Sequence, residues 1–369
     1  MTSKITFFFI SCITLMSATC GNNGGSGSNS TTSNPCQGLT DPFGFTAASC
    51  QCAQISYGTD PKQKYDIYIP QTPVNQGTLR PIVIFIHGGG FGKGDKRQTF
   101  NPNSNMDDVA AFLAEGYAVA SINYRLLVKN ETEGIKKCIQ DCREAITHIR
   151  NLPNNYQTIP VALQNIPSAE NLNSDKIALW GSSAGAGIAM LIGFDADPIT
   201  NPVKAIWADK PQATYDIDQW HSLSGVFTSC TQLKICSLLN SDYPKYVKAI
   251  YGLGNNVPNN CPSIITASIN YRNDVDILNY INVSNDPPIW IENTKPVNNE
   301  ENTCPSTKEL LNHHKNHCTV LKDKLDGIPV EWHLKLRNMA NNNIEITQSM
   351  GADNWNSGVA FVINKLNML

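Results

Sequence analysis

The sequence predicts an α/β fold in which a mostly parallel central sheet carries helices on both faces. Residues 81–86 form a continuous apolar run rich in β-branched side chains, which is typical of a strand buried on both faces. A second apolar run, residues 177–180, passes through glycines directly into the helical run 188–192. Strand-like and helical segments alternate along the chain, and this alternation is the pattern of a parallel sheet with helical crossovers.

The remaining elements follow from hydrophobic periodicity. Residues 64–69 alternate between polar and apolar side chains, as expected of a half-buried strand among the leading antiparallel strands. Downstream, the pattern predicts helices at 107–115 and 135–152, strands at 117–122 and 203–207, and a Pro/Asn-rich connection at 153–174. The last strand is expected at 330–335, before a final helix that begins near Asn354. From residue 208 to 286 the periodicity weakens, so we expect an insertion after the sixth strand.

Two glycine-rich turns carry residues suited to chemistry. Gly181 and Gly185 flank Ser183 in a Gly-x-Ser-x-Gly pattern between a strand and a helix, a turn that exposes the serine in a strained conformation. A serine hydroxyl needs a base to become a nucleophile, and the oxyanion that it creates needs preorganised donors. The strand 81–86 ends in His87-Gly88-Gly89-Gly90-Phe91, where the glycines allow backbone N–H groups to turn toward a ligand. Either pattern alone could be a glycine turn without chemistry.

Together the two motifs resemble the α/β-hydrolases of the carboxylesterase and hormone-sensitive-lipase-like kind. The likeness covers residues 60–210 well and the remainder loosely. It implies a hydrolase that cleaves a carboxylic ester through an acyl-Ser183 intermediate. The oxyanion hole would then be formed by the amides of Gly88, Gly89, Gly90 and Ala184. In this family an insertion such as 208–286 often roofs the substrate pocket, although its aromatic residues could equally pack a surface loop: Trp207, Tyr215, Trp220 and His221.

The resemblance places the triad acid after a strand near residues 286–291, but no Asp follows Ile291 at the usual short distance. The nearby carboxylates are Glu292, Glu300, Glu301 and Glu309. If residues 293–308 are an insertion, Glu309 falls just before the helix where the acid belongs. We therefore select Glu309 as the acid.

The base is harder to place, because the family's histidine belongs in the loop after the last strand and residues 336–353 contain none. The candidates are His333, inside the expected last strand, and three histidines near the acid-side helix, of which His314 is selected: His313, His314 and His317. These three could instead form a solvated helix face. His313 and His317 could also bind a metal with Cys318, but the Glu of a His-Glu-x-x-His site is missing, so no metal is expected. His87 is expected to support the glycine loop rather than to accept the proton of Ser183.

Other ligand classes fit the sequence less well. The glycines after His87 lack the Gly-Lys-Ser/Thr spacing of a phosphate loop, and residues 181–187 do not match the dinucleotide fingerprint. The net charge of −3 gives no electrostatic reason to expect a nucleic acid partner. We therefore expect a small-molecule ester substrate and no cofactor. The rival interpretation is a binding protein that keeps the pocket but has lost turnover, because no His follows the last strand.

The amino-terminal residues indicate export. Lys4 precedes an apolar stretch that suits the centre of a secretory signal, so residues 1–20 are interpreted as a signal peptide. Residues 15–20 loosely resemble a bacterial lipoprotein cleavage box, in which Cys20 would be lipidated and would be the sole membrane attachment. Ordinary secretion is the alternative. Residues 21–35 would form a flexible tether, and 36–369 the hydrolase domain, placed in a secreted, periplasmic or cell-surface setting.

Cysteine usage agrees with export, because ten cysteines remain after Cys12 and Cys20, an even number that suits disulfides. The sequence allows several pairings, each of which would close a loop: Cys36 with Cys50 or Cys52, Cys230 with Cys236 or Cys261, and Cys304 with Cys318. Cys138 and Cys142 lie one turn apart on the predicted helix 135–152, where the alternative to disulfide bonding is that they are two core thiols.

Overall fold

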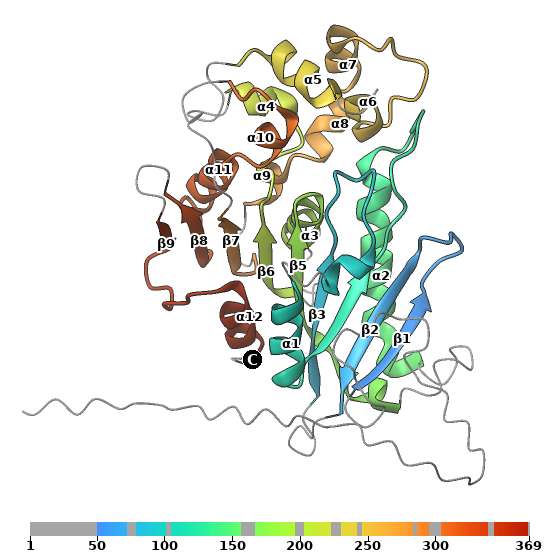
Figure 1. The fold of residues 1–369 in the computed structure, drawn as a ribbon, viewed down its shortest axis with the longest axis vertical. Coiled ribbons are helices and arrows are strands. Elements are labelled where there is room, and N and C mark those ends of the chain that lie inside the picture. The colour runs from blue at the N-terminus through green and yellow to red at the C-terminus, as the bar shows by residue number, and fades with distance from the viewer. Residues whose placement is uncertain are drawn as a thin grey trace, which may run out of the picture. The chain divides into compact units, whose positions relative to one another are not determined.

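The apolar run at 81–86 forms the centre of a nine-stranded sheet in the computed structural model (Figure 1). The structure describes residues 50–71, 79–100, 105–155, 167–195, 203–222, 230–241, 246–282, 286–294, 304–338 and 343–367. The strand order is β1-β2-β4-β3-β5-β6-β7-β8-β9. Strands β3 to β8 are parallel, and only the pairs β1–β2, β2–β4 and β8–β9 in the described ranges are antiparallel. The predicted mostly parallel sheet is therefore confirmed.

The strand bounds follow the apolar runs closely. They are β1 Cys50–Ser56, β2 Lys64–Pro70, β3 Arg80–Ile86, β4 Ala118–Ile122, β5 Leu172–Ser182, β6 Val203–Asp209, β7 Ile289–Asn293, β8 Trp332–Arg337 and β9 Ile344–Gln348. Strand β9 was not predicted. The strand that was expected to be the last one, at residues 330–335, is β8. Every residue of β9 is at least partly exposed, and an edge strand of this kind lacks the apolar signal of a core strand.

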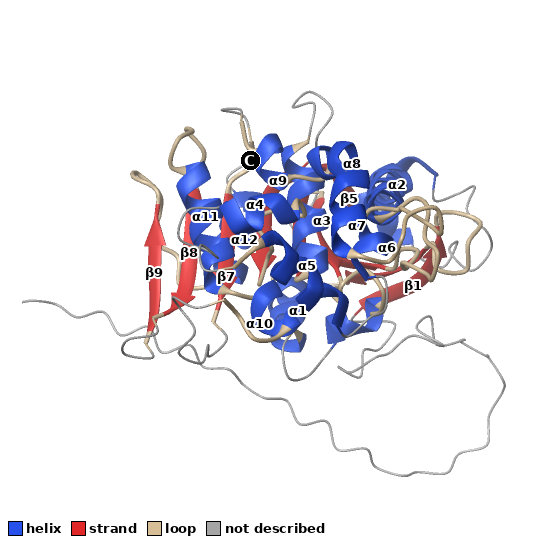
Figure 2. Cartoon of the chain, turned by 90° about the horizontal axis from the view of Figure 1, so that it is seen from above, coloured by secondary structure: helices blue, strands red, loops and turns tan. Residues whose placement is uncertain are grey.

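Helices cover both faces of the sheet, as Figures 1 and 2 show. On one face, α1 (Met106–Ala114) and α12 (Gly358–Asn367) contribute Phe112 and Phe361 to a core that also contains Val83 and Phe85 of β3. On the other face, α2 (Ile135–Asn155), α3 (Ala184–Phe194) and α11 (Lys315–Leu325) cover a larger core that contains Ile82, Ile84 and Ile86. Alternate residues of β3 thus enter opposite cores, which confirms a strand buried on both faces.

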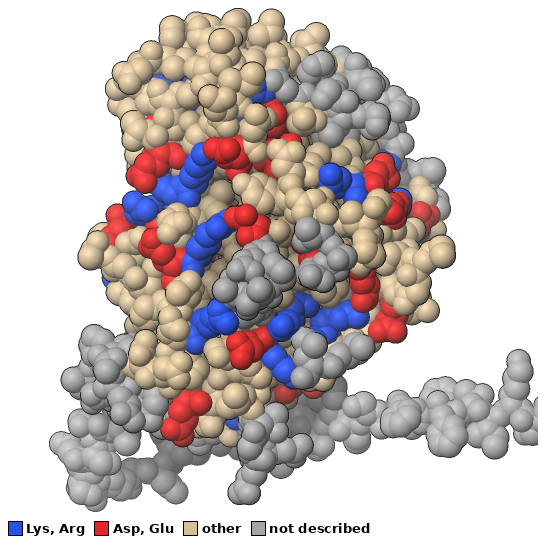
Figure 3. Space-filling model, turned by 180° about the vertical axis from the view of Figure 1, so that it is seen from behind, with Lys and Arg blue, Asp and Glu red and all other residues tan. Residues whose placement is uncertain are grey.

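The insertion after β6 contains short helices that lie beyond the carboxyl ends of the parallel strands (Figure 1). They are α4 (Ile217–Ser222), α5 (Gln232–Ser241), α6 (Tyr246–Ile250), α7 (Cys261–Ala267), α8 (Ile269–Asp274) and α9 (Ile277–Tyr280). A buried ion pair between Arg272 and Asp216, 2.5 Å apart, connects α8 to the beginning of the insertion. On the face drawn in Figure 3, charges of both signs are interspersed below the insertion, whose own end of the molecule is largely uncharged.

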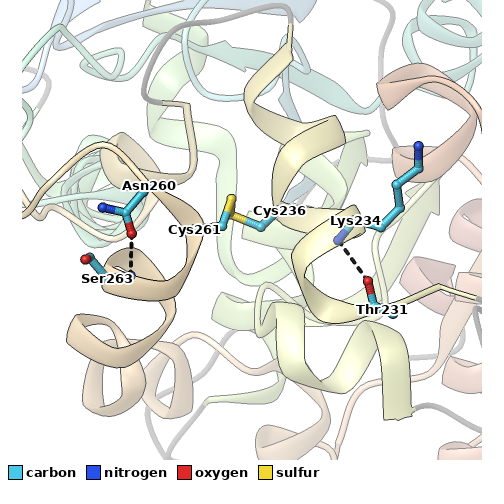
Figure 4. The surroundings of a disulfide bond; sticks show 6 residues. All are labelled: Thr231, Lys234, Cys236, Asn260, Cys261 and Ser263. Atoms are coloured by element: carbon cyan, nitrogen blue, oxygen red, sulfur yellow. Dashed lines mark hydrogen bonds between the residues drawn. A yellow bond between two sulfur atoms is a disulfide. The ribbon is translucent and has the colours of Figure 1, made fainter.

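Disulfides fasten the insertion, but the pairs differ from those predicted. Cys236 bonds Cys261, which joins α5 to α7, and Cys230 bonds Cys304. In Figure 4, Asn260 caps the start of α7 and the Thr231 hydroxyl accepts from the Lys234 N–H at the start of α5. The pairing of Cys304 with Cys318 is wrong, because Cys318 is a buried free thiol on α11.

The other cysteine predictions have different outcomes. Cys52 is disulfide-bonded, whereas Cys36 lies outside the described residues. Cys138 and Cys142 are buried free thiols on α2, which agrees with the core-thiol alternative. Residues 1–35, which carry the predicted signal and tether, also lie outside the described part. None of the helices in the described ranges is both long and apolar enough to cross a membrane.

Candidate active site

Ser183 occupies the sharp turn between β5 and α3. Its φ of +53° is unusual for a residue with a side chain, and its N–H donates to the Asp209 carbonyl at 2.8 Å. The flanking glycines are required by close backbone approach. A Cβ on Gly181 would lie 2.2 Å from the Gly185 carbonyl oxygen, and one on Gly185 would lie 2.0 Å from that of Ile86. The turn therefore presents the Ser183 hydroxyl at the carboxyl edge of the sheet.

The imidazole that reaches this hydroxyl belongs to His313. Its Nε2 lies 2.8 Å from the Ser183 Oγ, within hydrogen-bond reach. His313 follows the short helix α10 (Lys308–Asn312) in the connection between β7 and β8. His314, the residue selected from the sequence, is instead the N-cap of α11, where its Nδ1 accepts from the Asn316 N–H at 3.2 Å. Because capping directs the His314 side chain to the helix, His313 replaces it beside Ser183.

The other candidate histidines lie away from the Ser183 hydroxyl. His333 lies inside β8, and its Nε2 is 2.8 Å from a carboxylate oxygen of Glu331. His87 donates from Nδ1 to the Gly88 carbonyl at 2.8 Å and stacks on Tyr124, with ring centroids 4.4 Å apart. Burial lowers the pKa of His87 to about 4, so this imidazole is neutral near pH 7. His87 is thus part of the glycine loop.

The glycine loop after β3 lies against the serine turn. Gly89, Gly90 and Phe91 have φ values of +111°, +60° and +62°, so three consecutive residues turn the backbone sharply. A Cβ on Gly88 would lie 2.8 Å from the Ser182 carbonyl oxygen. This close approach places Gly88, Gly89 and Gly90 in the wall of the same cavity as Ser183 and Ala184.

The cavity above Ser183 has a volume of about 650 Å³ and is lined by both apolar and polar residues. The insertion contributes these apolar and aromatic residues to the lining: Tyr215, Ile217, Trp220, Leu239, Val247, Ile250 and Tyr251. The polar lining residues include Lys93, Gln98, Asn105, Lys210 and Gln212. Tyr215 and Trp220, two of the aromatic residues noted in the sequence, therefore line the cavity. The side chain of His221 lies outside the described residues.

Comparison with family models gives a match to BD-FAE over residues 65–291, which is more than half of the chain. The chain belongs to the BD-FAE family. Its strand order, serine turn and glycine loop together form a carboxylesterase-like α/β-hydrolase fold. The fold and family expected from the two motifs are confirmed.

Two curated proteins match shorter parts of this BD-FAE member. The methylphloroacetophenone synthase of Cladonia uncialis is 30% identical over 165 residues, which are 42% of this chain and 6% of that protein. The 5-methylorsellinic acid synthase of Aspergillus terreus is 31% identical over 132 residues, 36% of this chain and 4% of that protein. The chain thus spans only a small fraction of either relative.

Solved structures of esterases are also similar. Esterase B from Lactobacillus rhamnosis is 18% identical with a TM-score of 0.47, covering 78% of this chain and 75% of that one. A truncated carbohydrate esterase from gut microbiota is 16% identical with a TM-score of 0.49, covering 79% and 88%. A bacterial heroin esterase is 18% identical with a TM-score of 0.46, covering 88% and 85%.

Carboxylates of this BD-FAE member cluster at the carboxyl ends of β6 and β7. Asp209 accepts from the Ser182 hydroxyl at 2.8 Å and lies 2.5 Å from the Lys210 ammonium. Burial, and then the charge of Asp209, raise the pKa of the Glu292 carboxyl, which accepts from the Trp290 indole at 2.8 Å. Glu309, selected as the acid, lies in α10, and its side chain is outside the described part. In the described ranges no group of three or more His, Cys, Asp or Glu is arranged to hold a metal.

Two further polar residues near His313 were missed by sequence reasoning. Gln212 follows β6 and Asn293 ends β7, and each donates to a backbone carbonyl beside or at His313. Their positions in the sequence could have revealed them. Polar residues at or just after the ends of parallel strands lie together at one edge of the sheet.

Proposed function

We propose that this protein is a serine hydrolase that cleaves a carboxylic ester through an acyl-Ser183 intermediate, with His313 as the base. The observation that carries the proposal is the 2.8 Å contact between the Ser183 Oγ and the His313 Nε2. A nucleophile and a base within hydrogen-bond reach, at a strained turn facing a cavity, are the parts that acyl transfer requires.

In the first half of the reaction, the Ser183 oxygen attacks the ester carbonyl carbon while its proton passes to Nε2 of His313. The negative charge that develops on the carbonyl oxygen is held by amide N–H groups of Gly88, Gly89, Gly90 and Ala184. Ala184 begins α3, so the positive end of that helix also favours the oxyanion. Collapse of the tetrahedral intermediate expels the alcohol, which takes the proton from His313.

The second half returns the enzyme to its starting state. A water molecule gives its proton to Nε2 of His313 and attacks the acyl carbon. The second tetrahedral intermediate releases the carboxylic acid, and Ser183 recovers its proton. His313 thus acts as the base that accepts the nucleophile's proton and then as the acid that gives this proton to the leaving group.

Covalent labelling and ester hydrolysis test the proposal together. A fluorophosphonate should modify Ser183 and fail to modify Ser183→Ala, and His313→Ala should hydrolyse a short-chain aryl ester at least a hundredfold more slowly. His148→Gln is the matched histidine control, because His148 lies on α2 beside the Tyr65 hydroxyl. Labelling at Ser182, or a His313→Ala variant as fast as the wild type, would overturn the assignment. If wild type and Ser183→Ala are equally inert, the binding-protein interpretation replaces it.

We also propose that the protein works outside the cytoplasm, secreted or anchored through a lipid on Cys20. The disulfides Cys230–Cys304 and Cys236–Cys261 support this proposal, because such bonds persist in oxidising compartments. Mass spectrometry of the native amino terminus tests it. A mature chain that begins at or near Cys20 is expected, whereas residues 1–19 intact on a fully reduced working protein would contradict it.

A further inference from the structure

Three consecutive backbone carbonyls around the catalytic imidazole each accept a hydrogen bond from a side chain. The Leu311 carbonyl is 3.0 Å from the Nε2 of His317, and the Asn312 carbonyl is 2.9 Å from the Gln212 amide nitrogen. The His313 carbonyl is 2.9 Å from the Asn293 amide nitrogen. Helix α10 ends at Asn312, and the last carbonyls of a helix have no donor within the helix. Side chains from three other elements supply the missing donors.

His317 donates because its tautomer is fixed. The backbone N–H of Ala213 donates to Nδ1 of His317 at 3.2 Å, so the ring proton must be on Nε2, which faces the Leu311 carbonyl. The ring is fully buried and its centroid lies 4.8 Å from that of Trp220. Burial also lowers the pKa of His317 to about 3. A neutral imidazole with a single tautomer therefore connects the β6–α4 segment to α10.

Gln212 also has a fixed orientation. Its amide oxygen accepts from the Tyr215 hydroxyl at 3.2 Å, which leaves its amide nitrogen directed at the Asn312 carbonyl. The same Tyr215 lines the cavity above Ser183. The donor to Asn312 is thus held in place by the cavity wall.

We infer that Gln212, Asn293 and His317 are positioning residues, a carbonyl clamp that holds the His313 imidazole at Ser183. His313 needs such support, because it and His314 form only the short link between α10, which ends at Asn312, and α11, which begins at Lys315. A displacement of about 1 Å at a reacting group can cost on the order of a hundredfold in rate. The inference rests on the proposed role of His313 as the base.

The test replaces an N–H donor with an oxygen of nearly the same shape. In Gln212→Glu and in Asn293→Asp, a carboxylate oxygen would face the carbonyl oxygen that now accepts a hydrogen bond, and the link should move away. We expect kcat for an aryl ester to fall at least tenfold in each variant. Gln212 lines the cavity, so the KM comparison is made on Asn293→Asp, in which KM should stay within about twofold. Gln348→Glu is the matched control, because the Gln348 amide donates to the Ala352 carbonyl at 3.0 Å beside the edge strand β9. It should keep wild-type kcat.

A double-mutant cycle separates positioning from a general structural role. If the clamp acts through the imidazole, Gln212→Glu and Asn293→Asp should cause no further loss when His313 is already Ala. An equal loss in the presence and absence of His313 would overturn the clamp. Wild-type kcat in both acidic variants, alongside a strong His313→Ala effect, would also overturn it and leave the proposed function intact. If His313→Ala has the same kcat as the wild type, the proposed function itself would be refuted. If an acidic variant does not fold, Gln212→Leu or Asn293→Ala removes the donor without adding charge, and the same comparison applies.

Discussion

Acidification should destabilise this protein through His317. Burial lowers the pKa of this imidazole from 6.5 to about 3, so the unfolded chain binds a proton at pH values where the folded protein does not. Stability from the neutral imidazole is fully present above pH 6.5 and is lost progressively as the pH falls toward 3. The structural reason is direct, because a proton on Nδ1 would face the Ala213 N–H that now donates to it.

The magnitude follows from the two pKa values. Between pH 8 and pH 5, the preferential protonation of unfolded His317 should remove about 2 kcal/mol from the free energy of unfolding. His87, whose pKa is lowered to about 4 by burial, should contribute a similar loss over the same range. A variant that changes His317 alone therefore isolates half of the combined effect.

Urea unfolding followed by tryptophan fluorescence measures this difference. In His317→Gln, the side-chain oxygen can accept from Ala213 and the amide can donate to Leu311, without a group that titrates. Between pH 8 and pH 5 the variant should lose about 2 kcal/mol less unfolding free energy than the wild type. If both proteins lose the same unfolding free energy between pH 8 and pH 5, His317 must accept a proton in the folded protein as readily as in the unfolded chain. That result would refute the argument.

Two further predictions concern the fold that carries the site. Gly185→Ala should unfold the protein or lower the free energy of unfolding by at least about 3 kcal/mol, because the new Cβ would lie 2.0 Å from the Ile86 carbonyl oxygen. Gly327→Ala is the control. Its new Cβ would lie 3.6 Å from the nearest atom, so it should shift the thermal midpoint little. Replacing both Cys236 and Cys261 with Ser opens a loop with a sequence separation of 25, which should cost about 3 kcal/mol. An unchanged urea midpoint in that double variant would contradict it.

The sheet could be predicted from sequence where burial leaves a strong pattern. Strand β3 is apolar at nearly every position because both of its faces are covered, and the Gly-x-Ser-x-Gly turn is constrained by backbone contacts that only glycine allows. Strand β9 lacks such a pattern because it lies at the sheet edge with exposed side chains. The Cys230–Cys304 disulfide was equally hidden, since it joins segments 74 residues apart that meet only after the insertion folds.

The choice between His313 and His314 shows a finer limit. The two residues are neighbours, and which one reaches Ser183 depends on where α11 begins. Once Lys315 is the first helical residue, residue 314 is the N-cap, and its side chain is engaged by the helix start. Sequence reasoning located the histidine cluster but not the helix boundary, which is the least certain part of any helix assignment.

The position of His313 in the chain follows from the strand order. The sheet places β5, which ends just before Ser183, two strands from β7 and three from β8. The β7–β8 connection therefore begins about 10 Å from β5. After β8, the Asn338 N–H donates to the Asn343 carbonyl at 2.7 Å as the chain turns back into β9. Residues 336–353 contain no histidine, so this part of the chain supplies no imidazole. The β7–β8 connection is closer, but it presents His313 from a short link rather than from within a helix or strand. The donors at three successive carbonyls hold that link in place.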